Sequence, residues 1–236
     1  MDFYTSCIKD IDLTSDLSDK IFLTFDIDWA VDNVLSYSID LVEKFDIKVT
    51  WFVTHDTPLL DRLRENPKFE LGIHPNFNFL MQGKHDKGEN YKEVIDNILR
   101  IVPEAVSVRS HSMTQNSPML DYFTECGLTH DSNHFIPHDS GLVLQPWKIW
   151  NGLIKCPYFW EDDVAFLEKD LKILNTINNG GLKIYDFHPI HVFLNTENPT
   201  RYQSTRAVHR NKELSEHRYD GLGTRNLLEQ LVSKCK

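Results

Sequence analysis

Apolar and polar residues alternate along this chain in two different patterns. Short, largely apolar runs are typical of buried strands, and they predict strands at 20–26, 48–54, 69–74, 105–109, 127–131 and 182–188. The segments between them have helical periodicity and predict helices at about 30–45, 57–66, 90–101, 116–126 and 162–178. A repeated strand-helix order favours a parallel sheet covered by helices, so we expect an α/β fold with a closed or nearly closed barrel.

Two segments fit this alternation poorly. Residues 132–160 contain Trp147, Trp150 and Trp160 but have no clear helical period, which predicts a β-excursion or a long loop. The stretch after His191 is polar and weakly periodic until a last predicted helix at about 224–234. No linker separates these parts, so we predict a single domain over 1–236, with a core at about 20–190 and a C-terminal extension at 191–236.

Composition narrows the class of protein. The chain has 236 residues and a net charge of −10 without a basic stripe, which disfavours a nucleic-acid partner. No apolar run is long enough for a membrane span and the first residues lack the features of a signal peptide, so we expect a cytoplasmic protein. The four cysteines form no Cys-x-x-Cys pair, which indicates reduced structural thiols rather than a zinc knot or a disulfide framework.

Residues capable of chemistry follow the predicted strands. The carboxyl ends of parallel strands meet at one mouth of a barrel, so these residues are expected to lie together, although each could also cap a strand or form a core ion pair. The set comprises Asp26, Asp28, His55, Asp56, His74, Arg109, His111, His130, Asp131, Asp186 and His188.

The stretch TFDIDWA at 24–30 places two acids at the end of one strand. Asp26 and Asp28 would point the same way and repel each other unless a metal ion, a proton or an arginine stood between them. His74 ends another strand and could bind zinc, and Asn78 lies four residues later, where one helical turn would place it on the same face. These residues are candidates for a metal site.

The order of these segments resembles the polysaccharide deacetylases of carbohydrate esterase family 4. The resemblance covers roughly residues 20–190 and rests on TFDID, KVTWFVTHD, LGIHPNFN, VRSH, GLTHDS and KIYDFHP, in that order. It implies a distorted (β/α)7-type barrel with surrounding helices. This chain departs from the family pattern at the inserted Ile27 and at Asn78, which stands where a second histidine is expected.

The resemblance also implies a role for each matching residue. Asp26 would be the general base, held by Arg109, and His188 would protonate the leaving group. The metal ligands would be Asp28, His74 and Asn78. Zinc is the expected ion, with Mn²⁺, Mg²⁺, Co²⁺ or Ni²⁺ as alternatives because an amide oxygen is a poorer zinc ligand than imidazole.

The predicted function is a metal-dependent hydrolase that removes an acetyl or formyl group from the nitrogen of an amino sugar, in a surface polysaccharide or its precursor. In the cytoplasm such an enzyme would meet a nucleotide sugar or a lipid-linked glycan. The alternatives are a hydrolase of small non-sugar amides and a carbohydrate-binding barrel without a competent metal site. Asp186 is a candidate partner for His188, WEDD at 160–163 could contact a glycan, and the oligomeric state is left open.

Overall fold

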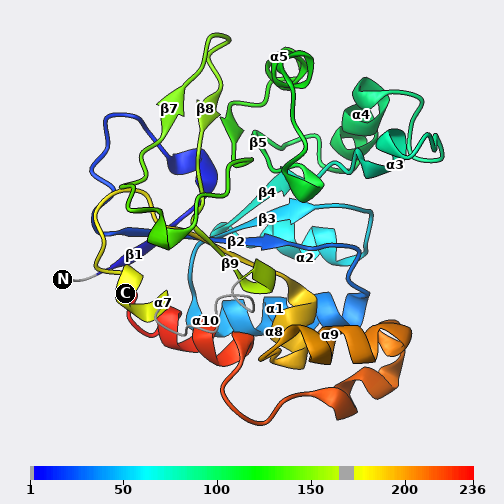
Figure 1. Cartoon of the computed structure of the whole chain (residues 1–236), viewed down its shortest axis with the longest axis vertical. Coiled ribbons are helices and arrows are strands. Elements are labelled where there is room, and N and C mark those ends of the chain that lie inside the picture. Colours follow the sequence, from blue (N-terminus) through cyan, green and yellow to red (C-terminus); the bar gives the residue numbers. More distant parts are fainter. Residues whose placement is uncertain (1–2, 165–172) are drawn as a thin grey trace.

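The computed structural model describes residues 3–164 and 173–236, and its strands form one sheet (Figure 1). Within these ranges the sheet has ten strands, in the order β7-β8-β6-β5-β4-β3-β2-β10-β9, with β1 paired to β2. The strands are β1 (Tyr4–Ser6), β2 (Lys20–Asp26), β3 (Val49–Val53), β4 (Phe69–Ile73), β5 (Ser107–Val108), β6 (His130–Asp131), β7 (Trp147–Lys148), β8 (Ile154–Lys155), β9 (Trp160–Glu161) and β10 (Ile184–Phe187).

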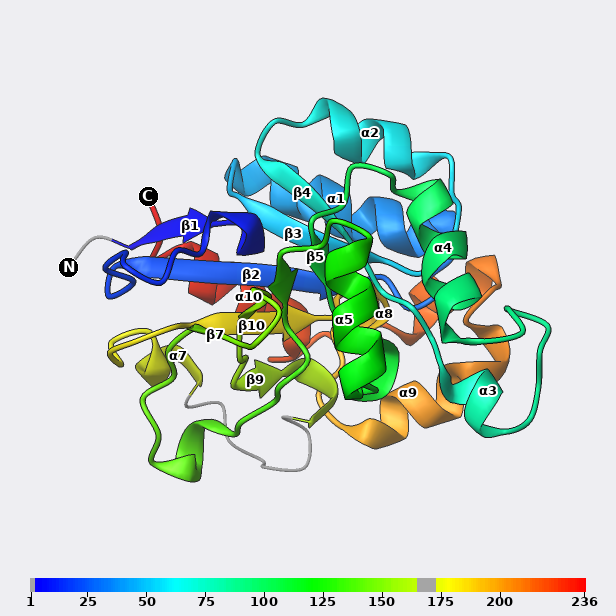
Figure 2. The same cartoon turned by 90° about the horizontal axis from the view of Figure 1, so that it is seen from above.

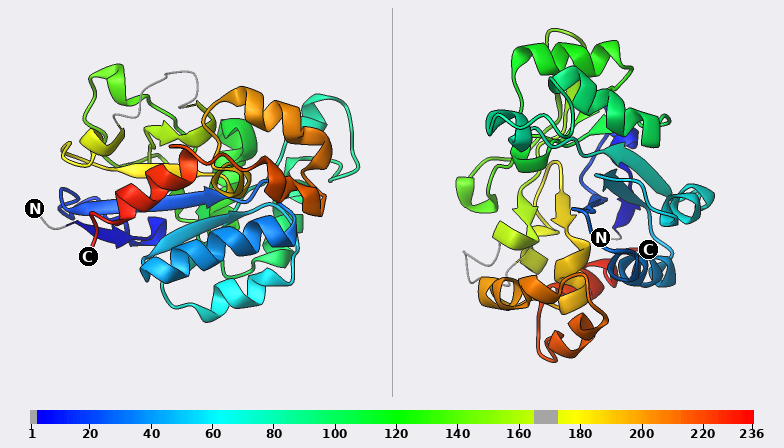
Figure 3. Two further views of the ribbon diagram at one scale, coloured as in Figure 1. Left: turned by 90° about the horizontal axis from the view of Figure 1, so that it is seen from below. Right: turned by 90° about the vertical axis from the view of Figure 1, so that its right-hand side faces the viewer.

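Helices surround this sheet, as Figures 2 and 3 show from three further sides. The α-helices are α1 (Asp32–Phe45), α2 (Leu59–Glu65), α3 (Asn78–Met81), α4 (Tyr91–Ile101), α5 (Ser117–Glu125), α7 (Ile173–Thr176), α8 (Pro189–Leu194), α9 (Pro199–Thr205) and α10 (Thr224–Val232). The 3₁₀ helices are η1 (Ile8–Asp10), η2 (His111–Met113), η3 (His138–Ser140), η4 (Arg206–Val208) and η5 (Lys212–His217).

The α/β class predicted from the sequence is confirmed. Neighbouring strands pair in parallel except for β7 with β8, and the sheet curves into a half-barrel (Figure 3). Between β7 and β9, the two ends of the strand order, the described residues show no pairing, so the barrel is open rather than closed. Parallel pairing brings the carboxyl ends of β2, β3, β4, β5 and β10 to the same edge of the sheet.

The centre of the sheet consists of the most apolar strands. All residues of β3 and β4 are buried, as are those of β2 after Lys20. Phe25 of β2 stacks on Trp51 with ring centroids 4.5 Å apart and on Phe187 at 5.7 Å. Burial of such side chains supplies most of the stabilisation and fixes the strands whose ends carry the polar residues.

The C-terminal extension is helical and packs on the same domain. Helix α8 contacts both α1 and α10, and Phe3 forms a bridge with Cys235, so the two ends of the chain lie on one side of the molecule (Figure 1). Asn195 adopts a left-handed conformation, and its amide donates to the carbonyls of Tyr219 and Gly221. These bonds join α8 to the segment that precedes α10.

Some predicted elements differ in length, and the structure also has elements where none was predicted, such as β1 and α3. Strands predicted at 105–109 and 127–131 span only two residues each, and the 132–160 segment holds three short strands and a 3₁₀ turn. The helix predicted at 162–178 falls partly on 165–172, outside the described residues. Among the helices that the structure describes, none is long and apolar enough to cross a membrane.

Candidate metal centre and active site

Four loops at one edge of the sheet bring acids and histidines together. Asp28 follows β2, His74 follows β4, His111 begins the turn after β5, and His188 follows β10. Only β3 intervenes among these four strands in the sheet order, so residues far apart in the sequence meet at this edge.

The turn after β2 separates the two acids of TFDIDWA. Asp26 ends the strand, and Ile27 is fully buried in the hydrophobic core. Asp28 and Trp29 then take left-handed backbone conformations, with φ of 37° and 55°. Such values are uncommon for residues with side chains and are typical of functional turns. The inserted Ile27 therefore packs in the core, while the backbone reversal places Asp28 at the mouth of the sheet.

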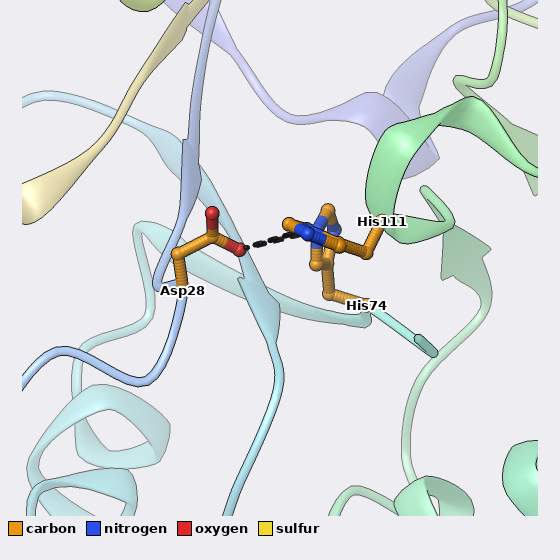
Figure 4. A group of neighbouring side chains, drawn as sticks. All are labelled: Asp28, His74 and His111. Atoms are coloured by element: carbon orange, nitrogen blue, oxygen red, sulfur yellow. Dashed lines mark hydrogen bonds and ion pairs between the residues drawn. The ribbon is translucent and has the colours of Figure 1, made fainter. Parts of the chain in front are cut away.

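Asp28, His74 and His111 form a compact group of three potential ligands (Figure 4). Asp28 Oδ1 lies 3.4 Å from His74 Nε2 and 3.3 Å from His111 Nδ1, and the two ring nitrogens are 3.3 Å apart. His74 is almost completely buried, whereas Asp28 and His111 remain partly exposed.

The spacing of these three atoms fits a tetrahedral ion. Zinc binds imidazole nitrogen and carboxylate oxygen at about 2.0–2.1 Å, which separates neighbouring tetrahedral ligands by about 3.3–3.4 Å. Asp28 Oδ1 is buried and has no hydrogen-bond partner of good geometry among the described residues. Two imidazoles and one carboxylate facing one another are a donor set that borderline divalent ions prefer.

The third predicted ligand, Asn78, has a different setting. It begins α3 rather than sharing a helical turn with His74, and its side-chain amide donates to Ser112 Oγ at 3.0 Å. The adjoining residue, His111, faces Asp28 instead. From the sequence, His111 was one of the chemically capable residues that follow predicted strands and part of VRSH, but neither pattern predicted it as a metal ligand.

The charges of Asp28 and His74 depend on each other. Burial opposes ionisation of Asp28, but the His111 and His74 rings beside it outweigh burial and hold the pKa of its carboxyl well below the usual range. Burial likewise opposes protonation of His74, but Asp26 and Asp28 outweigh it and raise the pKa of the ring. The site thus favours a carboxylate next to positive charge, which either histidine protons or a bound cation could supply.

Arg109 lies beneath this group and is 1% exposed. Its Nη1 donates to Asp26 Oδ1 at 3.1 Å and also contacts Asp186. The guanidinium lies over the rings of Phe52 and Tyr158, 4.6 and 4.4 Å from their centroids. Burial alone would lower the pKa of Arg109, but the two aspartates raise it, so this cation stays charged and fixes the Asp26 carboxylate.

Asp26 also faces the proposed ligand His74. Its Oδ2 lies 3.4 Å from His74 Nδ1, on the side of the ring opposite Asp28. A carboxylate at the far nitrogen of a metal-binding histidine orients the ring and increases its basicity. Asp26 is 4% exposed, so its oxygens are shared between Arg109 and His74 in a nearly closed environment.

His188 is held by Asp162, a residue that the sequence suggested only as part of a glycan-contacting segment. Asp162 Oδ1 lies 2.7 Å from His188 Nδ1, and its Oδ2 accepts the backbone N–H of His188 at 2.9 Å. The other ring nitrogen, Nε2, lies 3.6 Å from Asp28 Oδ2. Burial lowers the pKa of His188, but Asp162 outweighs that effect and raises it well above its usual value. The alternative partner, Asp186, instead contacts Arg109 and accepts from Thr24 Oγ1.

Two other strand-end candidates have structural partners. His130 Nε2 lies 3.0 Å from the carbonyl of Ile11, and Asp131 forms a buried ion pair with Lys155 at 2.8 Å. Their contacts join β6 to neighbouring segments, away from the ligand group.

A cavity of about 600 Å³ opens onto the site. Its floor includes the proposed ligands Asp28 and His111 together with His188, and Trp29 lines it next to them. Trp29 packs edge-on to His111, with ring centroids 5.1 Å apart. Part of the cavity wall comes from α9 and the residues that follow it, within the C-terminal extension.

Comparison with known proteins gives consistent results. A family model described as WbmS-like polysaccharide deacetylase matches residues 23–206. The fold is similar to the crystal structure of a Bordetella bronchiseptica protein, WbmS, described as a candidate polysaccharide deacetylase involved in O-antigen biosynthesis. The two chains are 44% identical, with a TM-score of 0.92 over 98% of each. A protein from Mycobacterium smegmatis, described as a candidate polysaccharide deacetylase, shares the fold at 16% identity. Its TM-score is 0.50 over 92% of this chain and 91% of that one. No curated protein matches the chain.

Proposed function

We propose that this chain, which belongs to the WbmS-like family of polysaccharide deacetylases, removes a short N-acyl group from an amino sugar. Its family makes it a hydrolase of carbon-nitrogen bonds other than peptide bonds. The substrate would be a bacterial surface polysaccharide or its precursor. Its 44%-identical relative is described as involved in O-antigen biosynthesis, which supports this choice. A cytoplasmic location remains a prediction.

The observation that carries the proposal is the group formed by Asp28, His74 and His111 on the floor of the cavity, with three donor atoms 3.3–3.4 Å apart. We assign these residues, rather than Asn78, as the ligands of a divalent ion, with zinc favoured by the two imidazoles. When bound, such an ion polarises an acyl oxygen and lowers the pKa of water.

The remaining residues have roles that follow from their contacts. Arg109 fixes one oxygen of Asp26, and we assign Asp26 as the group that accepts the proton of the attacking water. Its second oxygen orients His74. Asp162 holds Nδ1 of His188 and leaves Nε2 directed toward Asp28 at the cavity floor, where it would donate a proton to the departing amine. Hydrolysis then yields a carboxylic acid and a free amino sugar.

Release of acetate or formate from a panel of N-acylated sugars tests this function. The zinc-loaded protein is expected to release one of these acids, and Asp26→Asn is expected to lower kcat by about 10²–10⁴-fold, as for loss of a general base. Asp61→Asn is the matched control, because Asp61 is an exposed acid on α2. A zinc-loaded protein that is inert across the panel, or full activity in Asp26→Asn, would contradict the proposal.

A further inference from the structure

The C-terminal extension contributes part of the cavity wall, and this part carries two arginines. Arg206 and Arg210 both line the cavity, and both are exposed. They follow α9 in the C-terminal extension, beyond the segment on which the sequence resemblance rested. The proposed reaction uses neither residue.

Other arginines of the extension have internal partners. Arg201 forms two hydrogen bonds with the Glu197 carboxylate and donates to the carbonyl of His217. The guanidinium of Arg218 lies over the Phe193 ring at 3.9 Å, and Arg225 donates to the hydroxyl of Tyr37. These three side chains hold the extension together.

Arg206 and Arg210 have no such partner. Among residues 3–164 and 173–236, no acceptor or acid lies within hydrogen-bond or ion-pair distance of either guanidinium. The unpartnered arginines of the extension are thus those that face the cavity. A guanidinium presents a planar set of donors that matches a carboxylate or a phosphate, often with two parallel hydrogen bonds.

The wall that carries them is a built part of the fold. Asn198 caps the start of α9 by accepting the backbone N–H groups of Thr200 and Arg201. The Tyr202 ring packs between those of His191 and His209, with centroids 4.9 Å away on each side. Thr205 Oγ1 also lies 3.0 Å from His209 Nε2. The two arginines therefore project from a backbone that is fixed against the site.

The acids and the arginines that line the cavity come from different segments of the chain. The acids that line it, Asp28 and Asp163, belong to the side of His188, where Asp28 is already in contact with histidines. The part of the wall that α9 and the residues after it form contributes only cationic or neutral groups, in a protein with a net charge of −10. A ligand that spans the cavity would best place a neutral amide at the ligand group and a negative charge at the wall.

We propose that Arg206 and Arg210 form a subsite for an anionic group, a phosphate or a carboxylate, carried by the glycan that occupies the cavity. This inference rests on the proposed function, because it makes the N-acylated substrate an acidic sugar or a sugar phosphate rather than a neutral oligosaccharide. A phosphate and a carboxylate would accept hydrogen bonds from the same guanidinium groups, and the probes below distinguish between them.

Kinetics with three matched substrates test the subsite. The zinc-loaded protein is given the methyl glycoside of an N-acetylhexosamine, the corresponding sugar phosphate and the corresponding uronic acid. At least one charged substrate is expected to have a KM about tenfold lower than the neutral one, and Arg206→Gln/Arg210→Gln is expected to remove this advantage while kcat stays unchanged. Arg100→Gln, which removes an exposed arginine of α4 outside the cavity, should retain it.

Direct binding separates failure of the subsite from failure of the deacylase function. Glucose 1-phosphate, methyl glucuronoside and neutral methyl glucoside are titrated calorimetrically into the metal-free protein. Stronger binding of an anionic probe to the native chain and to Arg100→Gln than to the double variant supports the subsite, even if no substrate is hydrolysed. Equal binding of all three probes, or an anion preference that survives in the double variant, overturns it, even if deacylation is observed.

Discussion

His111 Nδ1 lies 3.3 Å from Asp28 Oδ1, although the two residues belong to loops that follow different strands, β5 and β2. The contact completes a triangle of donor atoms with His74. It also makes His111, in the loop after β5, the third proposed ligand in place of Asn78, in the loop after β4. The identity of that ligand is directly testable.

His111→Ala is expected to weaken zinc binding by about 100-fold or more, because loss of a residue that only supports a ligand already costs about 10–100-fold. Metal content after dialysis against graded chelator measures the effect. Asn78→Ala is the matched comparison, since Asn78 contacts Ser112, next to His111. Loss of zinc in Asn78→Ala with full retention in His111→Ala would assign the third ligand to Asn78 instead.

Asp162→Asn is expected to lower kcat for N-acetyl sugars by about 10–100-fold with little change in KM, because the variant loses the anionic acceptor that holds His188 Nδ1. Steady-state kinetics measure both constants. With 4-nitrophenyl acetate the defect should shrink, since nitrophenolate departs without a proton. An equal loss on both substrates would show that Asp162 acts on the structure of the site rather than through proton donation by His188.

The sequence was most informative for strands whose own apolar residues show that the strand is buried. The apolar runs around Phe25, Trp51 and Leu71 predict the central strands because their side chains pack on both faces of the sheet. Asp28 and His74 could be placed at the mouth of the sheet for the same reason, since each follows such a strand.

Residues positioned by irregular backbone could not be placed in this way. His111 begins a tight 3₁₀ turn in which Ser112 has a φ of 56°, and that reversal sets the direction of the ring. Asp162 follows the two-residue strand β9, which is too short to leave a periodic signal. Helices α8 and α9 are short segments within polar sequence, and their packing on the domain supplies stability that local propensity lacks.

Arg109→Leu is expected to lower the free energy of unfolding by about 3–5 kcal/mol, because removing one partner leaves buried charge uncompensated. Asp26 and Asp186 both contact this guanidinium, and both are buried. Urea denaturation measures the loss. The double variant Arg109→Leu/Asp186→Asn should recover part of it, since one of the stranded carboxylates is then neutral.

Two comparisons make the Arg109 prediction specific. Arg64→Leu removes an exposed arginine that pairs with Glu104, and such surface pairs contribute about 0–1 kcal/mol. If Arg109→Leu costs no more than Arg64→Leu, or if the effects of Arg109→Leu and Asp186→Asn simply add, the buried network does not behave as one unit.

Acid is expected to loosen α9, the helix that precedes Arg206 and Arg210. Partial burial would raise the pKa of Glu197, but hydrogen bonds from Arg201 outweigh burial and lower it below its ordinary value of 4.5. A lowered pKa in the folded state stabilises that state above about pH 4.5 and loses this contribution as pH falls through the folded value. Hydrogen exchange of the α9 amides, corrected for its intrinsic pH dependence, should therefore show protection falling between pH 6 and pH 3.5. The change should be at most about fivefold, as for a surface ion pair.

Glu197→Gln should have the lower protection already at pH 6 and little further change, whereas Glu89→Gln, on an exposed loop, should follow the native protein. Native protection in Glu197→Gln at pH 6 would show that this ion pair does not hold α9.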